Sequence, residues 1–253
     1  MPDLSLLALA LAAFLAAGIV KGIVGFGLPT VALSVLAATA GFKTAVALVV
    51  LPALLTNVWQ AVSGGHLRPL LKRLGPMLVT IAIGVLAGTT LLAIVPGPPL
   101  AVLLGALLIL YAALGLFEVS PPPIGRHEVW FGPVLGGFNG VITGLTGTFI
   151  MPGLIYLEAL RLSRPELRQA MGILFAFSTL VLGLGLTRVA LLDQPLAIVS
   201  AAAVVPAFAG MAIGRRISDR LSNAAFRKAF FVGLIAVALV LVVRNGAMVF
   251  AGD

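Results

Sequence analysis

Two glycine-rich stretches interrupt the apolar sequence, and they carry the residue types best suited to chemistry. Residues 21–30 read Lys-Gly-Ile-Val-Gly-Phe-Gly-Leu-Pro-Thr, and residues 139–148 read Asn-Gly-Val-Ile-Thr-Gly-Leu-Thr-Gly-Thr. We expect non-helical backbone over both stretches, with a new helical arm starting after each. A helix start carries free N–H groups and partial positive charge, which suits an anion. Two such starts, one from each half of the chain, would make one central anion site.

Close helix packing is the alternative role for these glycines, because small residues let helix backbones approach one another in membranes. A binding site is favoured because the two broken stretches occupy corresponding positions in the two halves. The candidate substrate-binding residues in the stretches are Lys21, Gly22, Gly25, Phe26, Gly27, Asn139, Thr143, Gly144, Thr146, Gly147 and Thr148.

Lys21 is the only basic residue well inside an apolar run. A cation inside the membrane is costly and usually marks a functional site, here as the counter-charge of the anion. The alternative is that Lys21 stands at a hairpin tip and reaches the membrane interface along its own aliphatic stem. The sequence leaves both roles open.

Three polar residues in the ordinary apolar runs complete the candidate site. Asn57 and Gln60 lie one turn apart, and Ser178 occupies the equivalent place in the second half, beside Thr179. Their alternative roles are hydrogen bonds between helices, or bonds from a hydroxyl back to its own helix. We include Asn57, Gln60 and Ser178 as candidate substrate-binding residues.

The composition excludes most other classes of protein. Of the 253 residues, 61% are apolar and 9% are charged, whereas about 25% of an average soluble chain is charged. So few charges cannot cover a water-soluble globule, which excludes a soluble enzyme, a nucleic-acid-binding domain and a disordered chain. The net charge of +8 arises from basic residues in short loops, a pattern typical of a polytopic membrane protein.

No catalytic or metal-binding set can be assembled from the sequence. The chain has no cysteine, which excludes thiolate chemistry and disulfides. Its acidic residues stand at run ends or in loops, whereas proton-coupled transporters usually keep a carboxylate at mid-membrane. We therefore expect no enzymatic activity, no cofactor and no metal.

The apolar runs follow an order that occurs twice. A long interrupted run, residues 4–40 and then 129–160, is each time followed by three ordinary runs. The ordinary runs cover residues 44–62, 75–95, 100–117, 170–186, 195–213 and 229–243. This order indicates an internal duplication, with one membrane repeat at 1–120, a connecting loop at 121–128 and a second repeat at 129–253.

The basic residues favour a helical hairpin in each long run. If each long run crosses the membrane once, the basic residues divide almost evenly between the two sides. If each long run enters the membrane and returns to the side it came from, one side of the membrane has only Lys43, Arg188 and Arg244. The other side then collects Arg68, Lys72, Arg73, Arg126, Arg161, Arg164, Arg168, Arg215, Arg216, Arg220, Arg227 and Lys228. By the positive-inside rule, this richer side is cytoplasmic.

Each repeat then has five membrane segments, and an odd number places the two repeats in opposite orientations. The expected fold is an all-α polytopic membrane protein. It has two inverted repeats of about five segments each, the first long segment of each being broken into a helical hairpin. Both termini would lie outside a bacterial-type cytoplasmic (inner) membrane.

Several motifs carry a family resemblance. They are Gly22-Ile23-Val24-Gly25-Phe26-Gly27, Leu51-Pro52-Ala53-Leu54-Leu55-Thr56-Asn57-Val58-Trp59-Gln60, and Gly144-Leu145-Thr146-Gly147 with Pro152 and Tyr156-Leu157. In these pieces and their order the chain resembles the TauE/SafE family, small membrane permeases often called sulfite exporters. The resemblance covers essentially the whole chain and implies transport of sulfur-containing anions. The chain departs from the family's adjacent glycines at Gly27-Leu28-Pro29 and Leu145-Thr146-Gly147.

Residues and resemblance together predict a secondary transporter for a small anion such as sulfite, a sulfonate or sulfoacetate. The anion would bind at the membrane midplane between the broken hairpins. The alternative is a membrane-embedded scaffold or assembly protein without transport activity. The expected partners are the anion and membrane lipids, without nucleic acid. A coupling ion, proton or sodium, and a homodimer stay open.

Overall fold

The computed structural model describes residues 4–118, 121–149, 151–218 and 223–251. Most of the described residues lie in helices, and no strand occurs among them. Seven helical stretches within these ranges are long and apolar enough to cross a membrane. The expectation of an all-α polytopic membrane protein is therefore confirmed.

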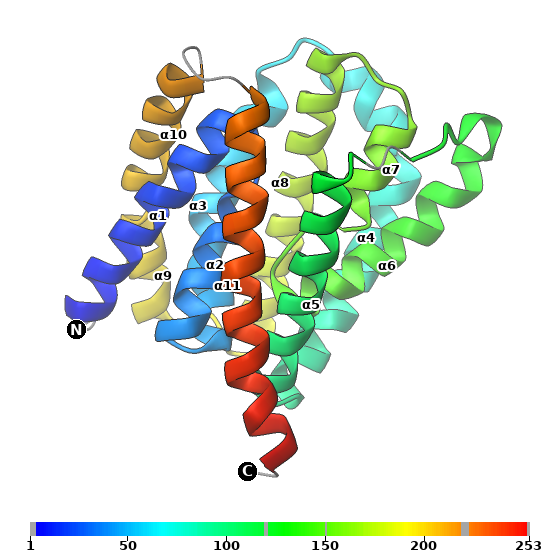
Figure 1. Cartoon of the computed structure of the whole chain (residues 1–253). Helices are drawn as coiled ribbons and strands as arrows, with labels where there is room; N and C mark the ends of the chain where they lie inside the picture. The colour runs from blue at the N-terminus through cyan, green and yellow to red at the C-terminus, as the bar shows by residue number, and fades with distance from the viewer. Residues whose placement is uncertain (1–3, 119–120, 150, 219–222, 252–253) are drawn as a thin grey trace. The chain divides into compact units, whose positions relative to one another are not determined.

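The helices overlap the predicted apolar runs, and several extend beyond them (Figure 1). The run expected at 195–213 is divided at Ala203 into two helices, and the run expected at 229–243 lies within a longer helix. The first half contains α1 (Leu4–Val24), α2 (Leu28–Thr39), α3 (Phe42–Val62), α4 (Leu67–Ile94) and α5 (Gly97–Leu116). The second half contains α6 (Glu128–Thr146), α7 (Gly153–Ala159), α8 (Arg164–Arg188), α9 (Gln194–Ala202), α10 (Val204–Ser218) and α11 (Asn223–Ala251). A single 3₁₀ turn, η1 (Gly125–His127), precedes α6.

The chain divides into two compact units, and each unit draws on both halves of the sequence. Unit 1 consists of Met1–Pro52, Val95–Val119 and Leu191–Asp253. Unit 2 consists of Ala53–Ile94 and Ser120–Ala190. The helix α3 contributes its first half to one unit and its second half to the other, with Pro52 inside the helix at the division.

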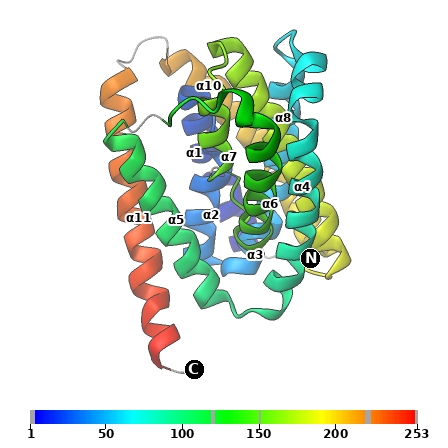
Figure 2. The ribbon, with the colours of Figure 1, turned by 90° about the vertical axis from the view of Figure 1, so that its right-hand side faces the viewer.

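In unit 1, α1 packs along α10, and α5 packs along α11. Figure 2 shows α5 and α11 side by side over much of their length. The α1–α10 interface is lined by glycine on both helices. A Cβ atom on Gly22 would lie only 2.9 Å from the Cα of Gly214. Glycine at these positions brings the two backbones into direct contact, as small residues do between membrane helices.

In unit 2, α6 packs along α4 in the same manner, and α8 also packs against α4. A Cβ atom on Gly140 would lie 3.0 Å from the Cα of Gly84, and one on Gly144 would lie 2.7 Å from the Cα of Gly88. The first helix of each half therefore packs on a glycine-bearing helix of the other half: α1 on α10, and α6 on α4.

Both long runs are broken, but the breaks are shorter than the sequence suggested. The helix α1 continues through Lys21 to Val24, and only residues 25–27 separate it from α2. Likewise α6 continues to Thr146, so residues 139–146 are helical. The expectation of non-helical backbone over 21–24, 28–30 and 139–146 is wrong. The glycines in those segments sit in helix–helix interfaces, where packing offsets their low helix propensity.

Three glycines in the two breaks have a positive φ. Gly25 and Gly27 have φ of 91° and 94°, and Gly147, which follows α6, has φ of 72°. A side chain resists this left-handed conformation, whereas glycine adopts it at little cost. After each break the chain turns back, so that α2 contacts α1 and α7 contacts α6 (Figure 1).

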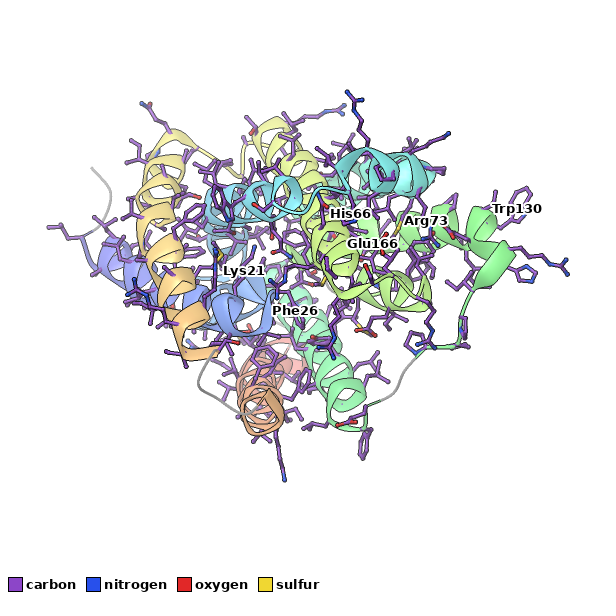
Figure 3. The ribbon with its side chains drawn as sticks, turned by 90° about the horizontal axis from the view of Figure 1, so that it is seen from above. Lys21, Phe26, His66, Arg73, Trp130 and Glu166 are labelled. Atoms are coloured by element: carbon purple, nitrogen blue, oxygen red, sulfur yellow. The ribbon has the colours of Figure 1, made fainter. Side chains whose placement is uncertain are left out.

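One end of unit 2 carries most of its basic residues. Arg73 of α4 holds Glu128 at the start of α6 with two hydrogen bonds of 2.7 and 2.8 Å. At the same end the backbone N–H of His66 donates to Gln169 Oε1 at 2.8 Å. Figure 3 looks onto this end, where His66, Arg73 and Glu166 lie together and Trp130 projects outward. Arg188, at the last turn of α8, lies at the opposite end.

Candidate functional site

Three of the predicted site residues are buried polar side chains of unit 2 on two helices that contact each other, and we refer to these three as the cluster. Asn139 and Thr143 lie one turn apart on α6, and Ser178 lies on α8, which contacts α6. All three are 0% exposed. The buried polar side chains described in unit 2 are amides and hydroxyls, without a charged group. The cluster therefore offers neutral hydrogen-bonding groups in an apolar setting.

The hydrogen bond between Asn139 and Gly153 fixes the orientation of the asparagine amide. The backbone N–H of Gly153, the first residue of α7, donates to Asn139 Oδ1 at 3.0 Å. Because a backbone N–H can only donate, the atom facing it must be the amide oxygen. The NH₂ group, Nδ2, is buried and has no hydrogen-bond partner among the described residues. Asn139 thus presents two unused N–H donors.

The hydroxyls of Thr143 and Ser178 also lack a partner within the described part of the chain. This is unusual for helical residues, whose hydroxyls commonly donate to a carbonyl one turn earlier. Their neighbours do so: Thr146 donates to the Ile142 carbonyl at 2.7 Å, and Thr179 donates to the Phe175 carbonyl at 2.6 Å. Thr143 and Ser178 therefore keep an unused hydroxyl donor, whereas the hydroxyls of Thr146 and Thr179 are already bonded to their own helices.

The second break is held by its own polar residues. The hydroxyl oxygens of Thr146 and Thr148 are hydrogen-bonded to each other at 3.2 Å, and the Thr148 N–H donates to Thr146 Oγ1 at 3.3 Å. Both side chains are buried, and Gly147 between them takes the positive φ that ends α6. These predicted site residues are occupied in shaping the break beside the cluster.

Unit 1 contains the first break and its predicted residues. Lys21 lies in the last turn of α1 and is only 3% exposed, among the helices of this unit (Figure 3). Phe26, in the break, stacks edge-on against Tyr111 of α5 with ring centroids 6.2 Å apart. The side chain of Lys21 is therefore held inside the protein rather than extended along its surface.

Thr30 in unit 1 is a further candidate that the sequence analysis did not select. It lies in the first turn of α2, is 0% exposed, and its hydroxyl has no partner among the described residues. The sequence feature that could have identified Thr30 is its hydroxyl, which comes directly after the break and Pro29. Ser34, one turn later, donates instead to the Thr30 carbonyl at 2.7 Å.

The two predicted residues of α3 are placed differently. Asn57 is 1% exposed within unit 2. Gln60 lies near the helix end, where its Nε2 donates to the Arg168 carbonyl at 2.8 Å. In turn, Gln169 Nε2 donates to the Ala61 carbonyl at 2.6 Å. This reciprocal pair ties the end of α3 to the start of α8, so the Gln60 amide serves a helix contact.

A comparison with protein families identifies the chain. A family model described as "Sulfite exporter TauE/SafE" matches residues 9–241. The chain belongs to the TauE/SafE family. Members of this family are membrane transporters rather than enzymes, and the long apolar helices agree with that class. Neither the search of curated proteins nor that of solved structures found a match to this chain.

Proposed function

We propose that this TauE/SafE protein is a secondary transporter that moves a small sulfur-containing anion, such as sulfite, a sulfonate or sulfoacetate, across the cytoplasmic membrane. Family membership supports transport of a small anion. The cluster of Asn139, Thr143 and Ser178 in unit 2 is the proposed binding site for that anion.

The observation that carries this proposal is the set of unused donors in the cluster. A buried polar group without a partner costs about 1–3 kcal/mol. Asn139, Thr143 and Ser178 each carry such a group. An anion with several acceptor oxygens would satisfy all of them together, as the oxygens of sulfite or of a sulfonate can. Neutral donors suit this task because they do not bind the anion so strongly that it cannot leave.

Unit 1 supplies a second set of groups with the same chemistry. Thr30 has an unused hydroxyl in the first turn of α2, a helix of 12 residues whose N-terminus carries partial positive charge. Lys21 adds a buried ammonium to the same unit. We propose that these groups also meet the anion during transport.

The helix packing supports the proposed inverted repeats. Gly22 of α1 packs on Gly214 of α10, and Gly140 of α6 packs on Gly84 of α4. The first helix of each repeat thus contacts the fourth predicted membrane segment of the other repeat. A reciprocal exchange of this kind is expected of a duplicated chain whose halves are related by a two-fold axis.

Flux through the purified protein tests the proposed function. The full-length chain is reconstituted into liposomes, and entry of sulfite and of a simple alkanesulfonate is followed over time. We expect saturable flux that a variant with Asn139→Ala, Thr143→Val and Ser178→Ala together abolishes. The variant with Thr179→Ala is the matched control, because that hydroxyl is already bonded to its own helix. Absence of saturable flux of either anion in the unaltered protein would contradict the proposal.

A further inference from the structure

Asn139 links the proposed anion site to the returning arm of the second hairpin. One side of its amide, Oδ1, accepts the Gly153 N–H at 3.0 Å, and Gly153 begins α7. The other side, Nδ2, is buried and without a partner among the described residues. One planar group therefore joins the place where we propose that the anion binds to the first peptide of α7.

The start of α7 is packed so closely that Gly153 has little room to move relative to Asn139. A Cβ atom on Gly153 would lie 2.9 Å from Asn139 Oδ1 and 3.1 Å from Leu174 Cδ2 of α8. The helix α7 has only 7 residues, and residues 151 and 152 before it are not helical. A helix this short has few hydrogen bonds of its own, so its position depends on contacts such as the one from Asn139.

We propose that Asn139 couples occupancy of the anion site to the docking of α7, a proposal that rests on the proposed function. An anion oxygen that accepts from Nδ2 pulls the proton toward itself, which shifts electron density through the amide onto Oδ1 and makes Oδ1 a stronger acceptor for the Gly153 N–H. The anion then binds more tightly when α7 is docked than when it is released. That differential affinity is what lets a ligand shift a conformational equilibrium.

The corresponding position in the first half carries a residue that cannot do this. Lys21 precedes Gly22 as Asn139 precedes Gly140, and both glycines pack directly against a glycine on the partner helix. A lysine ammonium donates but has no acceptor atom. It cannot receive a backbone N–H from the returning arm, so the coupling belongs to unit 2 alone.

Two substitutions of Asn139 separate its two roles. Asn139→Asp keeps an acceptor oxygen for the Gly153 N–H and, at mildly alkaline pH, replaces the Nδ2 donors with a second acceptor and a negative charge. Asn139→Ala removes both functions. Thr143→Val removes a proposed anion donor and leaves the bond from Gly153 to Asn139 intact, so it serves as the matched control.

Hydrogen exchange of the α7 backbone tests the coupling. Full-length protein in lipid nanodiscs is measured by mass spectrometry with sulfite or with an equal ionic strength of chloride, and sulfite binding is measured alongside. In the unaltered protein, sulfite at about ten times its Kd should slow exchange of the α7 amides about tenfold. Asn139→Asp should keep the protection seen in chloride but bind sulfite roughly 100-fold more weakly.

The remaining variants complete the test. Asn139→Ala should exchange its α7 amides faster even in chloride, whereas Thr143→Val should match the unaltered protein there. The coupling is overturned if sulfite binds without slowing α7 exchange, or if Asn139→Asp binds sulfite as the unaltered protein does. Loss of sulfite and sulfonate binding by the unaltered protein itself would instead remove the proposed function, and the coupling with it.

Discussion

At the scale of single residues, two sets of buried helical hydroxyls differ in their hydrogen bonding. Thr146 and Thr179 bond to carbonyls of their own helices. Thr30, Thr143 and Ser178 are equally buried but do not, within the described residues. The difference is significant because the return bond is the default for a hydroxyl in an apolar helix. It places the proposed binding chemistry on side chains rather than on the glycine backbone.

Thr143→Val and Ser178→Ala should each weaken sulfite binding by roughly 10- to 150-fold. Each removes one hydrogen bond to an anion, worth about 1.5–3 kcal/mol, and also relieves a buried unpaired hydroxyl in the empty protein. Folding stability should therefore hold or rise while affinity falls. Binding isotherms and thermal unfolding of the same preparations check both effects. Unchanged affinity in both variants would remove these hydroxyls from the site.

At the scale of elements, the glycines of the two long runs have separate tasks. Gly22, Gly140 and Gly144 lie inside helices and allow direct backbone contact with α10 or α4. Gly27 and Gly147 end or begin helices through a positive φ. The two tasks are mixed along the sequence, and a run of glycine letters does not distinguish them. The distinction depends on which glycine faces another helix.

Gly140→Ala should lower the free energy of unfolding by about 1–3 kcal/mol, since overpacking a tight interface forces backbones apart. The added Cβ atom would meet the Ile81 carbonyl oxygen directly. Gly75→Ala is the control on the partner helix α4, where no atom lies within 4 Å of the new Cβ atom. That variant should gain about 0.5–1 kcal/mol from helix propensity. Equal stability of the two variants, measured by thermal unfolding in detergent, would contradict the interface.

Gly27→Ala should destabilise the first hairpin for a different reason. The φ of 94° at this position precedes the first turn of α2. A residue with a side chain pays about 1–2 kcal/mol to adopt a left-handed conformation. Gly233→Ala in α11 is the control, because its new Cβ atom meets no atom within 4 Å and its φ is not in the positive range. Chemical unfolding curves that coincide for the two variants would argue against the strained break.

At the scale of the whole molecule, the two compact units combine segments from both halves of the chain. Within unit 2, basic residues gather at the end where α4, α6 and α8 begin, and Arg188 lies at the other end. Within unit 1, Arg215 stands beside Gly22 near the end of α1, whereas Arg244 donates to the Ala38 carbonyl near the end of α2. Both distributions support the proposed topology with cytoplasmic basic ends and outward termini.

Cysteine labelling tests this topology on a clean background, because the chain has no cysteine of its own. Single substitutions Arg68→Cys and Arg164→Cys should react with a membrane-impermeant maleimide only after cells are opened. Lys43→Cys and Arg188→Cys should react in intact cells. The positive-inside rule is the physical reason, since basic loops are retained in the cytoplasm. Labelling of positions 43 and 68 from the same side would contradict the hairpin in the first repeat.

The sequence by itself determined the class of the protein, the positions of its membrane helices and the existence of two breaks. Hydropathy and the lack of charge decide these because they reflect each segment's transfer from water to lipid, which depends on local composition. The motifs also sufficed for the family. Asn139, Thr143 and Ser178 were all among the candidates, but so were Gly22, Gly144 and Gln60, which lie in helix contacts.

Only the tertiary structure decided where the helices end and which polar groups are left unused. Lys21 and Asn139 lie in helices because α10 and α4 cover the adjacent glycines, and that coverage comes from segments distant in sequence. The Gly153 N–H likewise reaches Asn139 across the second break. Hydrogen bonding and close packing depend on distances between segments, so no single stretch of sequence contains the information that selects the site.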